Sequence, residues 1–339
     1  MSDARAKFFD STAEPQGLAG ARGIYFDWRT LQPLVSVTLM YVLHTALPTA
    51  WDYKPKVLPY FGYVCVLLIF AATGLVILSV FYPDFRKRYA YKSYFYGVVF
   101  LFLNLYNVVT VKLNFLPSLY FPAVERVLGV FVTDWLFILK CLVFSLRLLL
   151  TGFLLGAFTG VLTGTLIGWS PKINYWIQPL IRIVGPIPST AWIPMALVVF
   201  PRATWASVWL IALGVWFPTT ILTSSGIMNV RKSYFEVSST LGASDLRNVL
   251  TIALPGAMPS IFAGLFNGTS SSFLTLMAAE MIGCKFGIGW YINWQRETLA
   301  YANIYSALIV IAITFSLLIN LQFKLRNRAL AWQKGTIRW

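Results

Sequence analysis

The sequence predicts an all-α polytopic membrane protein. Its 339 residues are 58% hydrophobic and 12% charged, whereas a soluble domain usually contains about 25% charged residues. The mean hydropathy is +0.69. Several uncharged runs contain about 17 or more residues, close to the ~20 that a helix needs to cross a bilayer. These observations favour membrane-spanning helices over the apolar core of a soluble protein.

The N-terminal segment, residues 1–32, is polar and mixed in charge. The first apolar run begins near Pro33, which is too late and too long for a cleaved signal peptide, so we expect a retained cytoplasmic tail. Two predicted spans follow, at 33–51 and 59–82. The single histidine, His44, and a proline interrupt the first of them. A lone histidine in an apolar run is more often packed than ligating.

Six further spans follow, because six more apolar runs have the length of a membrane helix. They are residues 93–111, 139–168, 177–200, 204–228, 257–279 and 303–323. The span at 177–200 contains Pro186, Pro188 and Pro194. Each proline removes a backbone donor, so we expect this span to be broken.

The positive charges lie mostly on one side of these spans. With the N-terminus inside, seventeen of the 27 Lys and Arg residues fall in inside segments and six in outside segments. Cytoplasmic loops carry an excess of Lys and Arg, so both termini are predicted to be cytoplasmic. The outside segments 113–138 and 281–302 are expected to form short surface helices. The second contains Trp290, Tyr291 and Trp294, and Trp and Tyr favour the membrane interface.

The polar inventory argues against several function classes. None of the 12 Asp and Glu residues lies deep in a predicted span, whereas ion-coupled carriers and proton pumps usually keep a carboxylate there. The sequence has no Ser-His-Asp set, and it has no GxxxxGK[ST] phosphate loop, so ATP would bind another polypeptide. The wide spacing of Cys65, Cys141 and Cys284 indicates neither a zinc site nor a disulfide framework. No basic stripe with interleaved aromatic residues indicates nucleic-acid binding.

Glycine recurs at every fourth residue of the fourth span. The residues are Gly152, Gly156, Gly160, Gly164 and Gly168. Small residues at this spacing form one ridge and let helix backbones approach closely. We therefore interpret the ridge as a helix-packing surface, with a direct role in a pathway as the alternative.

Two stretches are candidates for a path across the membrane. The first runs from 185 to 194 and contains three prolines and Trp192; broken backbone at membrane depth is tolerated where it is buried or lines a wet cavity. A simple kink is the alternative. In the seventh span, Asn267, Ser271 and Thr275 are four residues apart and share one helix face. Such groups can donate hydrogen bonds to oxyanions, with interhelical hydrogen bonding as the alternative.

The segment between the sixth and seventh spans reads as two short helices joined by a turn. Ser233 and Glu236 fit a capping box, and Gly242 suits the left-handed position after a helix. The Ser-Asp pair that follows can cap a second helix. Pro255 is expected to interrupt that helix before the seventh span. The apolar residues, which indicate packing on the membrane domain or on a partner, are Phe235, Leu241, Leu246, Val249 and Leu250.

This segment resembles the EAA motif of binding-protein-dependent ABC permeases, E-A-A-x3-G-x9-I-x-L-P. The matching residues are Glu236, Gly242, Ile252, Leu254 and Pro255. Val237 and Ser238 replace the two alanines, which can alter packing on the ATPase. Further resemblances are the glycine-rich residues 145–168, the P-I-P-x-x-A-W-x-P pattern at 186–194 and the A-A-E-x-I-G pattern at 278–283. Together they resemble the nitrate/sulfonate/taurine/bicarbonate branch over roughly residues 93–332.

The resemblance implies a type I importer permease with a six-helix core and about two extra N-terminal transmembrane helices. The implied divisions are a tail at 1–32, extra helices at 33–92, the permease domain at 93–332 with coupling helices at 232–255, and a tail at 333–339. The implied ATPase-coupling residues are Glu236, Gly242, Ala243, Asp245, Ile252, Leu254 and Pro255. The candidate path residues are Pro186, Pro188, Trp192, Asn267, Ser271, Thr275 and Glu280. One departure is Pro201-Arg-Ala-Thr204 where the family usually has a glycine-rich turn, so the outer turn can differ.

The implied function is passage of a small solute, such as an oxyanion, through the inner membrane of a bacterium. The implied partners are ABC ATPase subunits, a periplasmic or lipid-anchored solute-binding protein, a second permease copy and membrane lipid, with no nucleic acid. The chain would bind no cofactor itself, since ATP and Mg would be held by the partner ATPase, and it would not be an enzyme. The alternatives are a non-transporting membrane scaffold or sensor and an ion-coupled carrier.

Overall fold

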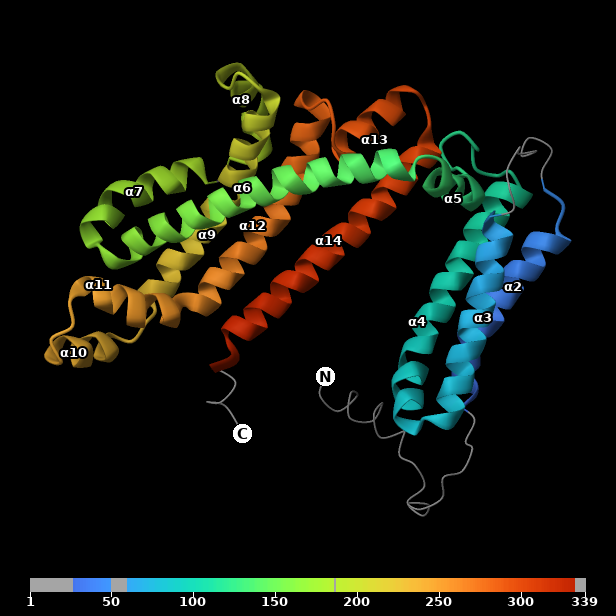
Figure 1. The fold of residues 1–339 in the computed structure, drawn as a ribbon, viewed down its shortest axis with the longest axis horizontal. Coiled ribbons are helices and arrows are strands. Elements are labelled where there is room, and N and C mark those ends of the chain that lie inside the picture. Colours follow the sequence, from blue (N-terminus) through green and yellow to red (C-terminus); the bar gives the residue numbers. More distant parts are fainter. Residues whose placement is uncertain (1–26, 50–59, 186, 333–339) are drawn as a thin grey trace, which may run out of the picture. The chain divides into compact units, whose positions relative to one another are not determined.

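The computed structural model describes residues 27–49, 60–185 and 187–332, and every regular element in these ranges is a helix (Figure 1). Six helices are long and apolar enough to cross a membrane, or seven if one bent pair counts as a span. The predicted all-α polytopic class is confirmed. Contacts divide the chain into two compact units, residues 1–118 with 123–125 and residues 119–122 with 126–339.

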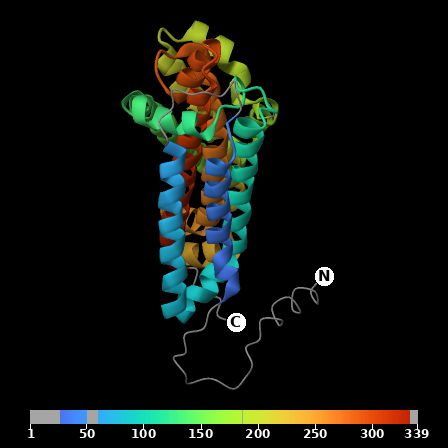
Figure 2. The ribbon, with the colours of Figure 1, turned by 90° about the vertical axis from the view of Figure 1, so that its right-hand side faces the viewer.

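The first unit is a bundle of three helices that lie side by side (Figures 1 and 2). The turn η1 (Trp28–Leu31) leads into α2 (Gln32–Ala46), α3 (Tyr60–Phe81), α4 (Pro83–Asn107) and the π-helical turn η3 (Val108–Lys112). Pro83 fits the first turn of α4 because its missing N–H has no intrahelical partner there. The third predicted span therefore begins ten residues earlier than the apolar run at 93 and includes a basic first half.

The first predicted span, 33–51, is shorter than expected where it is described. Helix α2 has 15 residues, about 22 Å at 1.5 Å per residue, against a hydrocarbon core of about 30 Å. It is not among the helices long enough to cross a membrane, whereas α3, with 22 residues, is. Leu47 ends the helix in an extended conformation directly before Pro48, because the residue before a proline disfavours the α region.

A polar cluster fixes the end of α2 within the first unit. The Lys112 ammonium donates to the carbonyl oxygens of His44 and Leu47, each at 2.6 Å. The His44 Nε2 lies 3.1 Å from the Glu125 carboxylate, and the His44 ring contacts Phe61 edge-on at 4.8 Å between centroids. The histidine is therefore packed and hydrogen-bonded, as its sequence context indicates.

The second unit contains the remaining helices, except that the first two residues of α5 belong to the first unit. They are α5 (Val124–Thr133), α6 (Trp135–Trp169), α7 (Pro171–Val184), η4 (Ser189–Trp192), α8 (Ile193–Val199), α9 (Ala203–Met228), α10 (Lys232–Thr240), α11 (Asp245–Asn248), η5 (Val249–Ala253), α12 (Leu254–Gly283), α13 (Ile288–Glu297) and α14 (Tyr301–Ala329). Helices α10 and α11 lie at one end of the long helices, and α8 and α13 lie at the other (Figure 1). The short helices expected in 113–138 and 281–302 are present as α5 and α13.

Helix α9 forms the centre of the second unit, packed against α6 on one side and α12 on the other. More than half of its most apolar window is buried within the chain, a larger share than in any other described span. Its Ile211 side chain is fully buried in a cluster with Leu149 of α6 and Leu276 of α12. The position of α9 is thus set by contacts along its length on two faces.

The predicted break in the span at 177–200 is present. Helix α7 and the η4–α8 segment meet at 84°. Ser170 begins α7 by accepting a hydrogen bond from the Ile173 N–H at 3.4 Å, and Pro171 occupies the first turn. Pro186, which the sequence places at the break, lies outside the described residues.

Candidate functional site

The glycine ridge of α6 is a packing surface against α9. A Cβ atom at Gly156 would lie 2.4 Å from the Ala212 carbonyl oxygen, and one at Gly164 would lie 2.6 Å from the Thr220 carbonyl oxygen. Because these neighbours are backbone atoms, they cannot move aside without separating the helices. The packing interpretation is therefore confirmed.

A cavity of about 230 Å³ lies between the end of α7, the start of η4, α9 and α12. Its polar residues are Ser189, Asn267 and Ser271, and its aromatic residues are Trp216 and Phe217. None of its described lining residues has an ionisable side chain. The volume suits a small solute, and the polar groups are hydroxyls and an amide, which can both donate and accept hydrogen bonds.

Two glycines keep this cavity open. At Gly185 a Cβ atom would lie 1.9 Å from the Phe217 ring, so only a glycine leaves room for that ring. At Gly214 a Cβ atom would lie 3.1 Å from the Ser271 hydroxyl oxygen, 3.2 Å from that of Ser189 and 3.4 Å from that of Thr275. Three hydroxyl groups therefore gather around Gly214.

The polar residues of the seventh span divide between two roles. Asn267 and Ser271 line the cavity, and Thr275 is buried one turn farther on, with its hydroxyl 2.6 Å from that of Ser189. The Thr269 hydroxyl instead donates to Gln322 of α14 at 3.0 Å. Interhelical hydrogen bonding and a polar cavity wall are both present on α12, on different faces.

Of the other candidate path residues, Pro188 lines the cavity. Trp192 packs among Ile193, Ala196 and their neighbours, and its Nε1 is buried without a partner in the described chain. Glu280 is not among the cavity residues. Gly185 is the first residue of the candidate stretch 185–194, whereas no sequence pattern singled out Gly214, Trp216 or Phe217, although Trp216-Phe-Pro218 is a distinctive tripeptide within its span.

Glu280 is fully buried in the last turn of α12, where it holds the loop that leads to α13. Its carboxylate accepts a hydrogen bond from the Gly289 N–H at 2.8 Å. Gly287 has a φ of +123°, and a Cβ atom there would lie 2.4 Å from the Glu280 carboxyl carbon. The glycines of this loop therefore make room for the carboxylate, which explains why the sequence is glycine-rich after Gly283.

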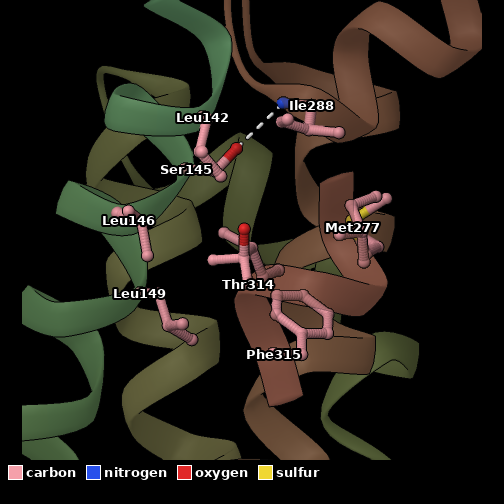
Figure 3. Close-up of a pocket in the computed structure, with 10 residues that line it drawn as sticks. Leu142, Ser145, Leu146, Leu149, Met277, Ile288, Thr314 and Phe315 are labelled. Atoms are coloured by element: carbon pink, nitrogen blue, oxygen red, sulfur yellow. Dashed lines mark hydrogen bonds between the residues drawn. The ribbon is translucent and has the colours of Figure 1, made fainter. Parts of the chain in front are cut away.

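A second pocket, shown in Figure 3, lies between α6, α12, α13 and α14. Its volume of about 10 Å³ holds at most one water molecule. In it the Ser145 hydroxyl accepts a hydrogen bond from the Ile288 N–H at 2.8 Å. Apart from Thr314, the other lining side chains, such as Leu149 and Phe315, are apolar. The hydrogen bond to Ser145 fixes the start of α13. The pocket is too small to be a solute site.

The coupling segment has the expected helix–turn–helix form at the end of the unit opposite α13. Gly242 follows α10 with a φ of +80°, the left-handed conformation predicted for it. The capping box prediction was wrong. Helix α10 begins at Lys232 with Arg231 at the N-cap position and no side-chain cap, so Ser233 already lies in the first turn. Ser244 occupies the N-cap position of α11, also without a side-chain bond.

The expected interruption at Pro255 is also absent. The chain is helical from α11 through the π-helical turn η5 into α12, with Pro255 in the first turn of α12. Pro255 has no N–H to donate to the preceding turn, and the π-helical turn η5 directly before it accommodates the missing hydrogen bond.

The apolar residues of the coupling segment point in two directions. Phe235 packs on Trp169 of α6 at 5.5 Å between ring centroids, and Leu254 lies against the same cluster. In contrast, Leu241 is 82% exposed and Leu246 is 69% exposed. Of the remaining predicted coupling residues, Glu236 and Asp245 are exposed, whereas Ala243, Ile252 and Pro255 are partly buried. Part of the segment is anchored, and part offers a free apolar surface.

The long apolar helices, the uncharged cavity and the exposed short helices at one end define the membrane subunit of a transporter. The chain belongs to the family of binding-protein-dependent transport system inner membrane components, whose model matches residues 152–331. It is a multi-pass inner-membrane protein, and the permease subunits of this family work with ATPase and binding-protein partners.

Three relatives show the branch. The chain is 29% identical to the nitrate import permease protein NrtB of Synechococcus elongatus over 284 residues, 84% of this chain and 92% of the relative. It is 31% identical to the bicarbonate transport system permease protein CmpB of the same organism, over 56% of this chain and 65% of the relative. It is 31% identical to the taurine transport system permease protein TauC of Escherichia coli, over 50% and 63%. This supports the branch that the sequence motifs indicate.

Proposed function

We propose that this chain forms the translocation pathway for a small oxyanion such as nitrate, bicarbonate, a sulfonate or taurine. The single observation that carries this proposal is the cavity between α7, η4, α9 and α12, lined by hydroxyl and amide groups. The named cargoes of the relatives are small and rich in hydrogen-bond acceptors, which agrees with those donors.

The coupling segment is proposed to carry the ATPase. Leu241 and Leu246 offer an exposed apolar surface, and exposed apolar patches mark interaction sites. Phe235 anchors the same segment to α6, so a movement of the docked partner can pass into the long helices. The excess of inside Lys and Arg residues supports a cytoplasmic location for this segment and for both termini.

The proposed assembly contains two copies of this chain, ATPase subunits that hold ATP and Mg, and a solute-binding protein on the opposite face. Residues 93–332 are proposed as the permease domain and the helices before them as an addition. ATP binding would favour one of two states of the pathway. It can shift the equilibrium only by as much as ATP binds the assembly more tightly in one state than in the other. The chain itself carries out no covalent step.

Reconstitution with the cognate ATPase and binding protein in vesicles tests the function. We expect ATP-dependent uptake of at least one of nitrate, bicarbonate, methanesulfonate and taurine, together with ATP hydrolysis that rises when the loaded binding protein is added. ATP hydrolysis that ignores the binding protein, without uptake of any of these solutes, would favour the scaffold or sensor alternative.

Gly242→Pro tests the coupling segment. Proline fixes φ near −65°, which is incompatible with the φ of +80° at Gly242. We expect uptake to fall at least tenfold while ATP hydrolysis persists and the protein remains in the membrane. Gly242→Asn is the matched control, because asparagine tolerates the left-handed conformation, and it should retain most uptake. Wild-type uptake in Gly242→Pro would refute the docking assignment.

A further inference from the structure

Gly214 differs from the other buried glycines of the second unit in what surrounds it. The ridge glycines of α6 face backbone oxygens and carbon atoms of α9. The three nearest atoms to a Cβ at Gly214 are all hydroxyl oxygens, from Ser189, Ser271 and Thr275, at 3.1–3.4 Å. Small hydroxyl residues also occur where two helices pack closely, but Ser189 belongs to η4, so the packing of α9 on α12 does not by itself account for the cluster.

The three hydroxyls come from two separate elements, and those of Ser189 and Thr275 are hydrogen-bonded to each other. Ser189 lies at the start of η4, just after the break in the span, and Ser271 and Thr275 lie one turn apart on α12. The Ser189 and Thr275 oxygens are 2.6 Å apart, and the Thr275 hydroxyl is also placed 2.9 Å from the Ser271 carbonyl oxygen. Thr275 is thus engaged on both sides, while Ser189 and Ser271 also line the cavity.

The described residues that line the cavity around this cluster carry no fixed charge. The described lining residues offer hydroxyl groups, the Asn267 amide and the aromatic faces of Trp216 and Phe217. The Trp216 N–H already donates to the Thr163 hydroxyl at 3.0 Å, so the ring faces the cavity as an apolar wall. A solute here would be held by dipoles and by shape. Binding by dipoles without a charge suits a pathway, because conduction requires that the cargo can also leave its site.

We propose that Gly214, with the hydroxyls of Ser189 and Ser271, forms an uncharged, size-limiting site for a small hydrogen-bond-accepting solute on its way across the membrane. This inference rests on the proposed function, and it assigns selection by size to Gly214. A methyl group there would lie 3.1 Å and 3.2 Å from the Ser271 and Ser189 oxygens, which is closer than ordinary van der Waals contact, and 3.4 Å from the Thr275 oxygen. It would therefore narrow the site and displace the donors.

Gly214→Ala tests the proposal in the reconstituted importer with nitrate, bicarbonate, methanesulfonate and taurine. We expect uptake of the solutes carried by the wild type to fall at least tenfold, with the largest loss for the largest of them. The protein level in the membrane and co-purification of the ATPase should not change, because only side-chain oxygens need to yield. Gly74→Ala on α3 is the matched control, since a Cβ there has no neighbour within 4 Å.

A labelling experiment separates this proposal from the proposed function. Ser271→Cys places a thiol in the cavity wall, and a small methanethiosulfonate reagent then reports access to it without any transport. The native thiols of Cys65, Cys141 and Cys284 are buried, and burial raises the pKa of the Cys284 thiol, so their background should be low. Adding Gly214→Ala to Ser271→Cys should slow labelling at least tenfold.

The outcomes decide the two proposals independently. Unchanged labelling on addition of Gly214→Ala, or wild-type uptake of every solute by Gly214→Ala, overturns the size-limiting site. Slowed labelling supports that site even if the wild type imports none of the four solutes, an outcome that would overturn the proposed oxyanion transport alone.

Discussion

At the scale of single residues, the backbone at Gly287 and Gly289 can lie close to the Glu280 carboxylate because neither residue has a side chain. The carboxylate is fully buried, and an isolated buried charge is costly unless it is hydrogen-bonded. The Gly289 N–H donates to the carboxylate at 2.8 Å. Gly287 lies against the same carboxylate with a positive φ, which residues that have a side chain rarely adopt. The loop and the carboxylate therefore depend on each other.

Gly287→Ala should destabilise the protein strongly. The added Cβ would lie 2.4 Å from the Glu280 carboxyl carbon, and the φ of +123° is strained for alanine by about 1–3 kcal/mol. We expect a lower melting temperature in detergent and a smaller folded yield. Combining it with Glu280→Ala removes the clash but leaves the strain, so recovery should be partial. Full stability of Gly287→Ala would contradict this account of the loop.

The sequence predicts some of these residues and not others, for a physical reason. The left-handed conformation of Gly242 follows from local rules about where helices end, so it could be predicted. The role of Gly214 depends on which elements meet around it, and Ser189 is 25 residues away along the chain. No local pattern contains that information.

At the scale of elements, the α6–α9 pair is held by a glycine ridge whose spacing is visible in the sequence. The spacing predicts a packing face, but it does not identify the partner helix.

Helix ends were harder to predict, because apolar runs stop where polar residues begin, while α4, α6, α12 and α14 continue beyond that point. The capping box prediction failed because α10 starts at Lys232, one residue before Ser233, so Ser233 lies inside the helix and not at its N-cap position.

Gly156→Ala should weaken this helix pair. A Cβ there would lie 2.4 Å from the Ala212 carbonyl oxygen and 2.9 Å from its Cα, so the helices would have to separate. Overpacking typically costs about 1–3 kcal/mol. We expect a clear drop in melting temperature in detergent, with Gly74→Ala as the unaffected control. Equal stability of the two variants would show that the helices can separate at no cost.

At the scale of the whole molecule, the chain forms two units, and the boundary between them is not the one that the apolar runs of the sequence suggest. The sequence suggests a core that begins at residue 93, whereas contacts group α4 with α2 and α3. Apolar runs mark which segments can enter a membrane, but they do not show which of those segments pack together. The family model, at 152–331, lies wholly within the second unit.

Truncation tests where the permease begins. A chain that starts at residue 119 keeps the second unit, and one that starts at residue 93 also keeps the second half of α4. Because the coupling segment and cavity lie in the second unit, which both truncated chains keep, we expect both to reach the membrane and to co-purify with the ATPase at levels within about twofold of each other. Loss of the ATPase only from the shorter chain would place α4 in the functional core.

The central helix α9 has one more consequence, which concerns the electric field across the membrane. From Ala203 to Met228 it contains no Asp, Glu, Lys, Arg or His. Moving one elementary charge through the membrane potential involves about 2.3 kcal/mol per 100 mV, so a shift of this helix moves no side-chain charge through the field. The side chains of the helix that carries Gly214 therefore give the membrane potential no charge to act on, and only the backbone dipole of the helix lies in the field.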